Sequence, residues 1–243
     1  MNTAEQLRQN LAQVETAVDD ACQRAQRRRD EITLIAVTKM HPPEAIAAVA
    51  ALGVTHIGEN KVQEFESKQP EWASLRERSP LQAHLIGHLQ SNKTAKAAAL
   101  FDAIDSVDSL RLAERLDAAA ADLQRTLPIL IEIKLSEEDS KHGIAPETPE
   151  LDALFERLPD LAHLRVRGLM TVPPYLRDPE AVRPYFRRLR TLRDDYAQRH
   201  PRLTLNTLSM GMTHDYAVAI EEGATEVRLG TALFGARSYN RGG

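Results

Sequence analysis

Residues 128–135 read Pro-Ile-Leu-Ile-Glu-Ile-Lys-Leu, a run in which most side chains are apolar. Such a run is typical of a strand that is buried on both faces, as the strands of a parallel sheet are. Apolar residues spaced by three or four positions flank this strand over residues 108–123 and 149–157, and this spacing predicts helices there. The sequence at the centre of the chain therefore predicts a helix, a strand and a helix in succession, which is the pattern of an α/β protein.

The same alternation continues in both directions along the chain. We expect strands at 32–37, 54–57, 83–86, 101–104, 128–135, 164–170, 203–209 and 226–229. We expect helices at 44–52, 60–67, 91–100, 108–123, 149–157, 179–199 and 213–222, with an Asp N-cap at 108 and a closing turn from 231. Eight strand–helix units predict a single (β/α)₈ TIM-type barrel, with a doubly wound open sheet as the alternative.

The N-terminal residues 1–30 precede the first predicted strand. Apolar residues recur there in steps of three or four from Leu7 to Ala25, which predicts an amphipathic helix. We expect this extra helix to pack on the barrel, so that residues 1–243 form one domain.

Composition limits the classes of function. The chain carries 31 Lys and Arg against 35 Asp and Glu, a net charge of −4, so its total charge does not favour nucleic acid or an anionic membrane. A nucleic-acid surface on one arginine-rich helix is the alternative, but acidic residues interrupt it and a solvated helix face is favoured. The arginines concerned are Arg183, Arg187, Arg188, Arg190 and Arg193.

Cys22 is the single cysteine, so an intrachain disulfide and a thiolate metal cluster are both excluded. No apolar run approaches the roughly 20 residues that cross a bilayer, and the N-terminus lacks the apolar core of a signal peptide. His56, His84 and His88 have no metal-ligand spacing with carboxylates or thiolates, so we expect them to be packing or pocket residues. Trp72 is expected in a loop. We expect a cytoplasmic monomer without a metal.

In a barrel of this type, functional groups lie where strands end and the next loops begin. Two such places pair a glycine with a hydroxyl residue, Ser-Met-Gly-Met-Thr at 209–213 and Arg-Leu-Gly-Thr at 228–231. Backbone N–H groups at helix starts bind anions, and the loops after strands seven and eight commonly hold phosphate. Helix caps and tight turns explain each motif alone, but their joint position favours a phosphate site.

Lys39 directly follows the run Leu-Ile-Ala-Val-Thr at 34–38, at the end of the first predicted strand, so its side chain would begin inside the barrel. Partial burial disfavours the ammonium form and favours a nucleophilic amine that can form a Schiff base. A lysine that reaches into solvent is the alternative. A Schiff-base lysine near a phosphate site suits pyridoxal 5′-phosphate (PLP), and it equally suits a sugar-phosphate aldolase.

Six segments, in order along the chain, resemble the pyridoxal phosphate homeostasis proteins. They are AVTK at 36–39, IGENKVQE at 57–64, HLIGHLQSNK at 84–93, GLMT at 168–171, LSMGM at 208–212 with Asp215, and VRLGT at 227–231 through Phe234 and Gly235. The resemblance implies a PLP-binding barrel similar to the N-terminal domain of bacterial alanine racemase, with a role in intracellular PLP (vitamin B6) homeostasis.

The resemblance also implies which residues bind the cofactor. Lys39 matches the PLP lysine, and Arg228 matches the arginine that faces the pyridine nitrogen. The phosphate contacts are matched by Ser209, Gly211, Gly230 and Thr231. Asn60 and Met170 match neighbours of the cofactor, and Lys141, after Ser140, matches a second lysine near the site. Many relatives carry a further lysine two positions after the PLP lysine. His41 stands there in this chain, so the resemblance assigns no transfer role to that position.

Arg228 also bears on whether catalysis is expected. An arginine only donates hydrogen bonds, so it leaves the pyridine nitrogen unprotonated and makes PLP a weaker electron sink. Alanine racemase adds a tyrosine base from a C-terminal domain, and we expect none here, although Tyr175 stays open as a candidate. The expected function is a PLP carrier with no catalytic residue, which exchanges cofactor with PLP-requiring apo-enzymes. A PLP-dependent amino-acid racemase is the alternative.

Overall fold

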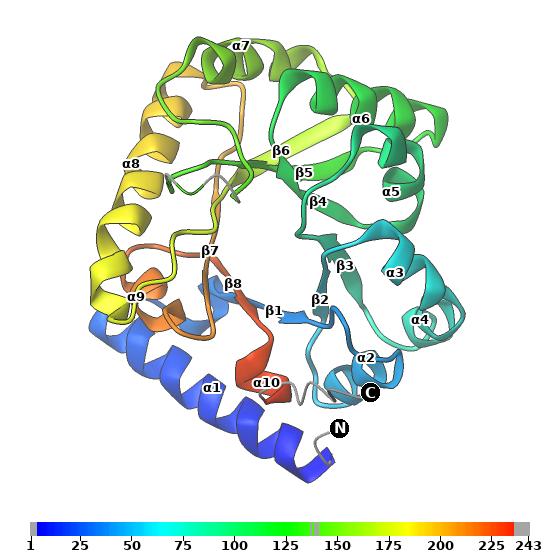
Figure 1. Ribbon diagram of the computed structural model, residues 1–243, viewed down its shortest axis with the longest axis vertical. Coiled ribbons are helices and arrows are strands. Elements are labelled where there is room, and N and C mark those ends of the chain that lie inside the picture. The colour runs from blue at the N-terminus through cyan, green and yellow to red at the C-terminus, as the bar shows by residue number, and fades with distance from the viewer. Residues whose placement is uncertain (1–3, 137, 139–140, 236–243) are drawn as a thin grey trace.

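The computed structural model describes residues 4–136, 138 and 141–235. Eight parallel strands form a closed barrel in chain order, and β8 pairs back with β1 (Figure 1). The strands are β1 Thr33–Val37, β2 His56–Glu59, β3 Gln82–Leu85, β4 Ala103–Val107, β5 Leu127–Glu132, β6 Leu164–Met170, β7 Thr207–Met212 and β8 Glu226–Leu229. The predicted (β/α)₈ barrel is confirmed, and the doubly wound open sheet is wrong.

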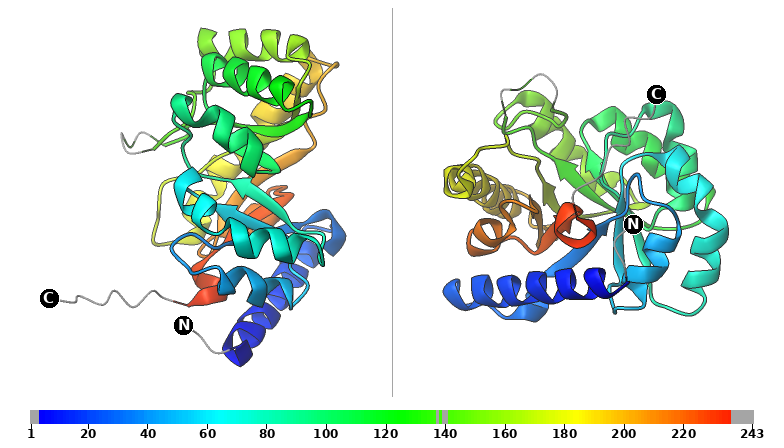
Figure 2. Two further views of the ribbon diagram at one scale, coloured as in Figure 1. Left: turned by 90° about the vertical axis from the view of Figure 1, so that its right-hand side faces the viewer. Right: turned by 60° about the horizontal axis from the view of Figure 1, so that its bottom comes forward.

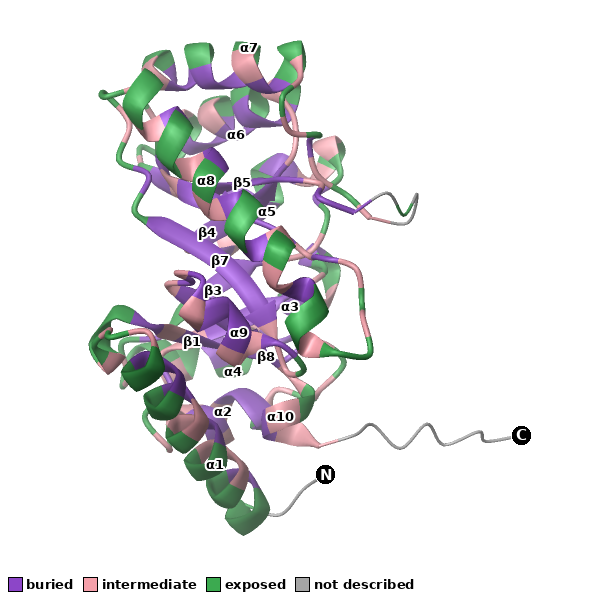
Figure 3. Cartoon of the chain, turned by 90° about the vertical axis from the view of Figure 1, so that its left-hand side faces the viewer, coloured by how far each residue is buried: buried purple, intermediate pink, exposed green. Residues whose placement is uncertain are grey.

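Helices surround the barrel (Figure 1), and its strands are largely buried (Figure 3). They are α1 Ala4–Arg24, α2 Glu44–Ala50, α3 Val62–Ser67, α4 Gln69–Arg76, α5 Thr94–Leu100, α6 Leu110–Asp122, α7 Pro149–Arg157, α8 Arg183–Arg199, α9 Tyr216–Glu221 and α10 Thr231–Phe234. In β5, Ile129 and Ile131 belong to the apolar core, while Leu130 points to the opposite face of the strand. Both faces of this strand are buried, which explains its nearly continuous hydrophobicity.

The helix predicted within residues 1–30 is α1, which runs along the outside of the barrel (Figure 2). Its buried face includes Leu7, Val14 and Val18, and the helix packs against α9 and α10. The Asn10 side chain donates a hydrogen bond to the Leu233 carbonyl of α10 at 2.8 Å. None of the described helices combines the length and the apolar character needed to cross a lipid bilayer.

Two local predictions around the helices were wrong. Trp72 lies in the unpredicted helix α4 rather than in a loop, and its 2% exposed side chain packs edge-on against Phe65 at 5.3 Å between ring centroids. The helix begins at Gln69 with a proline in its first turn, where a missing N–H costs no hydrogen bond. The N-cap of α6 is Ser109 rather than Asp108, because the Ser109 hydroxyl accepts from the Leu112 N–H at 3.3 Å.

Strand β7 also differs from its prediction, and this difference affects the phosphate motif. The strand covers Thr207–Met212 instead of 203–209, so Ser209 and Gly211 lie within the strand and the loop follows Met212. Gly211 has φ +94°, and a Cβ there would lie 2.5 Å from the Cβ of Ala219, so only glycine fits. The register with β8 shifts between Ser209 and Met212, as expected for an irregular strand.

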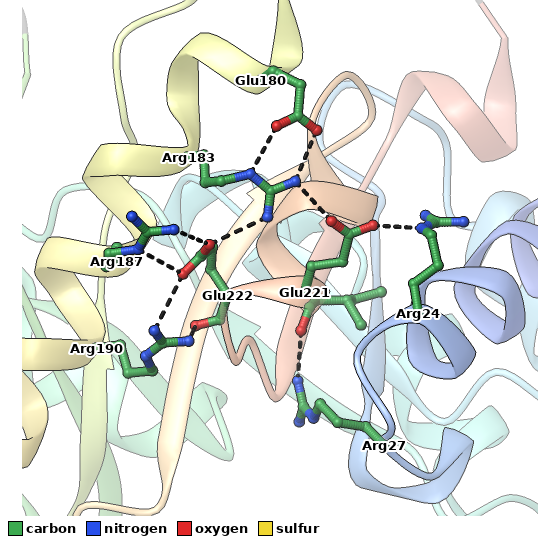
Figure 4. Close-up of polar contacts among 9 residues, drawn as sticks. Arg24, Arg27, Glu180, Arg183, Arg187, Arg190, Glu221 and Glu222 are labelled. Atoms are coloured by element: carbon green, nitrogen blue, oxygen red, sulfur yellow. Dashed lines mark hydrogen bonds and ion pairs between the residues drawn. The ribbon is translucent and has the colours of Figure 1, made fainter.

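An ion cluster joins α8 to the end of α9 (Figure 4). The Glu222 carboxylate is within 3.2 Å of Arg183, 3.0 Å of Arg187 and 3.3 Å of Arg190. Glu222 itself is 4% exposed. Three of the five arginines considered above for nucleic-acid binding are therefore engaged with one carboxylate of the same chain.

The substitution Glu222→Gln is expected to lower the free energy of unfolding by about 1–2 kcal/mol at neutral pH, between the values for exposed and buried pairs. The value is moderate because the Arg187 and Arg190 side chains stay 59% and 36% exposed. Burial raises the pKa of Glu222, but hydrogen bonds from Arg187 and Arg183 outweigh this effect and hold the pKa below its usual value. The stabilisation is therefore present at neutral pH and is lost as the pH falls through this low folded-state pKa.

Urea unfolding at pH 7 and under acid conditions measures this effect. The matched control is Glu180→Gln, because Glu180 also pairs with Arg183 but its side chain is 58% exposed. We expect the control to change stability by less than about 0.5 kcal/mol. Equal losses in both variants, or a Glu222→Gln loss that persists in acid, would contradict the prediction.

Candidate functional site

A cavity of about 370 Å³ lies at the carboxyl ends of the strands, where barrels of this type place their chemistry. Its volume falls in the range of small-molecule sites. Five of the nine predicted site residues line it, namely Lys39, Asn60, Arg228, Gly230 and Thr231. They come from the ends of β1, β2 and β8, so the barrel brings together positions that are far apart in the sequence.

Arg228 is the most rigidly held of these residues. Its side chain is buried, Nη1 donates to the Ser209 hydroxyl at 2.7 Å, and Nη2 donates to the Thr171 carbonyl at 2.8 Å. Burial lowers the pKa of Arg228, and nearby carboxylates, Asp105 foremost, oppose this effect. The guanidinium is thus fixed in orientation, and it offers a ligand donors but no acceptor.

Two residues of the predicted phosphate motif are not among those that line the cavity. The Ser209 hydroxyl is fully buried and accepts a hydrogen bond from Arg228, so in this structure it supports the arginine. Gly211 is buried within β7, behind Met212 and Thr213, which do line the cavity. A direct contact of Ser209 or Gly211 with a phosphate stays a prediction.

Met170 and Lys141 also lie outside the cavity lining. Met170 is fully buried at the end of β6, where it pairs in register with Ser209. Lys141 is half-buried in the segment between β5 and α7, and Ser140 before it lies outside the described residues. A role of either residue toward a cofactor remains a prediction.

His41 lies two positions after Lys39, in the loop that follows β1. Its ring lies 4.5 Å from the Phe234 ring of α10, measured between centroids. His41 therefore packs the loop after β1 against the short helix that follows β8. Lys39 and Thr231 of the cavity belong to these same two segments.

A buried lysine that the sequence analysis did not single out holds the backbone beside Lys39. Lys68, at the end of α3, is 3% exposed, and its Nζ donates to the Thr38 carbonyl at 2.9 Å and to the Glu59 carboxylate at 2.7 Å. The Thr38 hydroxyl donates to the same Glu59 oxygen at 2.6 Å. These contacts join the ends of β1 and β2 and thereby position Lys39 and Asn60. No sequence signal marked Lys68, because lysines beside helix ends are usually solvated.

A second buried network occupies the barrel interior. His84 contacts Asp105 at 2.8 Å through Nδ1 and His56 at 2.9 Å through Nε2, and Glu226 pairs with Arg167. Burial disfavours the charged form of His84, but the Asp105 carboxylate outweighs this effect and raises the pKa of His84. The pKa of His56 is lowered to about 4 by burial and by the charge of His84. Side chains two positions apart in a strand lie on the same face, so Glu226 lies on the same face of β8 as Arg228. The alternation of the strand could therefore have predicted this member of the network from the sequence.

Tyr175 and His214 stand at the mouth of the cavity. Both line it, their rings lie 5.1 Å apart between centroids, and Tyr175 is 77% exposed. Among the tyrosines in the described part of the chain, Tyr175 alone lines this cavity. The residue left open as a second base is therefore at the right end of the barrel for that role.

Comparisons with known proteins agree with this architecture. Residues 5–238 match the family model described as "Alanine racemase, N-terminal domain". A pyridoxal phosphate homeostasis protein of Aquifex aeolicus is 43% identical over 95% of this chain and 98% of its own length. PipY of Synechococcus elongatus, solved with PLP bound, is 39% identical, with a TM-score of 0.81 over 94% of this chain and 100% of that one.

A more distant comparison shows the fold alone. Alanine racemase of Clostridium difficile is 14% identical, with a TM-score of 0.71, and the match covers 97% of this chain but 61% of the racemase. The closed barrel, the position of its cavity and the extent of the sequence matches lead to one assignment. The chain belongs to the family of the pyridoxal phosphate homeostasis proteins, built on the barrel of the alanine racemase N-terminal domain.

Proposed function

We propose that this chain binds PLP covalently but reversibly through Lys39 and acts in PLP homeostasis as an exchangeable holder of the cofactor. The observation that carries the proposal is the shared cavity of Lys39, Arg228, Gly230 and Thr231 at the carboxyl end of the barrel. The PLP-bound structure of PipY, at 39% identity, supports the choice of PLP over a sugar phosphate.

The residues of the cavity fit this cofactor. When bound, PLP supplies an aldehyde carbon that reacts with a lysine amine and a pyridine ring that can accept electrons. Lys39 provides an amine on a half-buried side chain at the cavity wall. Gly230 is the N-cap of α10 and Thr231 its first residue, and backbone N–H groups at a helix start suit a phosphate. The Ala232 N–H already donates to the Thr213 hydroxyl at 3.0 Å, which leaves the N–H groups before it for this role.

Arg228 is the reason to favour a carrier over a catalyst. Its hydrogen bonds to Ser209 and Thr171 hold a guanidinium at the cavity. A guanidinium donates a hydrogen bond to a pyridine nitrogen and keeps its own protons, so it withholds the protonation that an acid in this position would provide. The cavity mouth beside the exposed Tyr175 gives amines and PLP-requiring apo-enzymes access to Lys39.

The proposal is tested by an absorbance spectrum after incubation with PLP, followed by borohydride reduction and peptide mapping. We expect a yellow protein that becomes labelled at Lys39. A protein that stays colourless and unmodified would overturn PLP binding and leave a barrel with a phosphate site.

The racemase alternative rests on Tyr175, which lines the cavity. We expect no sustained exchange of α-protons when PLP-loaded protein is incubated with L- and D-amino acids in deuterated water. Mass spectrometry of the amino acids measures this. Sustained exchange that disappears in both Lys39→Ala and Tyr175→Phe would establish the racemase and reject the carrier.

A further inference from the structure

Three polar side chains meet at the rim of the barrel, and none of them lines the PLP cavity. His88 follows β3, Asp108 follows β4 directly, and His142 lies in the segment after β5. One donor atom from each lies within 4.8 Å of the other two. Because three successive loops contribute one side chain each, the closed barrel creates this cluster and local sequence does not.

The spacing of the cluster suits a metal ion. His88 Nδ1 lies 3.2 Å from Asp108 Oδ2. Metal–ligand bonds of about 2.0–2.1 Å in tetrahedral geometry place two ligand atoms about 3.3 Å apart. The His142 ring lies against that of His88 at 4.1 Å between centroids and an interplanar angle of 14°. His142 is exposed, so rotation of its side chain can turn a ring nitrogen toward the ion.

The charges around the cluster also favour a cation at this point. Within the described ranges of the chain, Asp108 forms no ion pair with a lysine or arginine. The Asp108 carboxylate instead lies 3.2 Å from the His88 ring, so the cluster combines one carboxylate with two imidazoles.

Solvent can reach the cluster through a hollow of about 460 Å³ that is lined in part by His88. Lys61 and Lys93 line the same hollow, and their charges lower the affinity for any cation. A site here consequently depends on its two imidazole ligands as well as on the carboxylate. Two imidazoles and one carboxylate favour Zn²⁺ or Co²⁺ over Mg²⁺ or Ca²⁺, which prefer oxygen ligands.

The structure describes a second cluster of comparable spacing, formed by His84, Asp105 and Glu226. Its members are buried, and Glu226 is already paired with Arg167. An ion there would have to displace a buried guanidinium. Among the described residues, no lysine or arginine forms an ion pair with the rim cluster.

We propose that His88, Asp108 and His142 form a binding site for one divalent transition-metal ion of the Zn²⁺ or Co²⁺ type. Three protein ligands leave at least one position for water or an exogenous ligand. None of its three residues lines the PLP cavity, but Asn60 lines both that cavity and the hollow beside His88, so the two sites are neighbours.

The experiment uses untagged full-length protein. Co²⁺ is titrated by visible absorption and Zn²⁺ by calorimetry, for the wild type and for His88→Ala, His142→Ala and His163→Ala. His163→Ala is the control, because the His163 ring also lies near an aspartate, Asp117, at 3.9 Å. The exposed fractions of these two side chains, 43% and 21%, are close to those of His88 and Asp108, 39% and 18%. Among the described residues, His163 belongs to no cluster of three possible ligands.

We expect one equivalent of each metal to bind the wild type and His163→Ala equally. Loss of either rim imidazole should weaken binding by at least about tenfold. Thermal unfolding checks that the variants fold, and the exposed His142 makes His142→Ala the safer of the two. The same titration with Lys39→Ala should also be unchanged, which separates the site from metal chelation by bound PLP.

Three outcomes would overturn the site. They are the absence of saturable binding of either metal, an affinity that survives in both His88→Ala and His142→Ala, and binding that disappears in Lys39→Ala. None of them bears on PLP binding by the wild type.

Discussion

Lys39→Ala is expected to abolish stable PLP binding, with a fall in affinity on the order of 100-fold or more, equivalent to about 2.7 kcal/mol. The proposed phosphate and ring contacts of Gly230, Thr231 and Arg228, which line the cavity, would remain in the variant, but the amine proposed to form the covalent bond is lost. Lys68 cannot replace it, because its Nζ is buried and bonded to Thr38 and Glu59.

Equilibrium titration with PLP, monitored at the visible band of the imine, measures this effect. Lys96→Ala is the control, because Lys96 is an exposed lysine whose Nζ pairs with Glu66 at 2.7 Å. We expect the control to bind PLP like the wild type. A Lys39→Ala protein that keeps the visible band, with borohydride labelling of another lysine, would remove Lys39 from the proposed site.

Lys68→Met is expected to lower the free energy of unfolding by about 3–5 kcal/mol, the cost of leaving one partner of a buried ion pair alone. Glu59 is fully buried and accepts hydrogen bonds from Lys68 and from Thr38. Without Lys68, the carboxylate would keep only the Thr38 hydroxyl as a neutral donor. The ends of β1 and β2 would also lose the contact that joins them.

The loss should depend on pH in a defined direction. Burial raises the pKa of Glu59, against the hydrogen bonds of Lys68 and Thr38, which lower it. Removing Lys68 raises this folded-state pKa further above the unfolded value. A group of this kind contributes most to stability when it is protonated, and its contribution falls as the pH rises through the folded-state pKa. The destabilisation by Lys68→Met should therefore be larger at pH 8 than at pH 5.

Two further variants make the measurement specific. In the double variant Lys68→Met/Glu59→Met both members of the fully buried pair are gone, so it should recover much of the lost stability. The contact of Lys68 with the partly exposed Glu64 at 3.1 Å stays lost. Lys96→Met removes an ion pair whose two side chains are each 45% exposed, and it should change stability by less than about 1 kcal/mol. A Lys68→Met protein as stable as the wild type, or a double variant no more stable than the single one, would show that the buried pair contributes little.

The sequence by itself determined the barrel and much of the cavity. Strand β5 is apolar on both faces because parallel strands are covered by helices outside and by side chains inside, and this burial is visible as local composition. Once a barrel is predicted, the carboxyl ends of its strands identify the site. Lys39, Asn60 and Arg228 follow or end β1, β2 and β8, and all three line the cavity.

The tertiary structure decided which polar groups are partners. Ser209 contacts Arg228, Lys68 joins Thr38 to Glu59, and His142 lies against His88, although nothing in the local sequence specifies these pairs. The pattern of apolar residues along the chain predicts which residues are buried, because burying an apolar side chain is favourable whichever neighbours it contacts. Pairing depends instead on which strands become neighbours when the barrel closes, and that is a property of the whole chain.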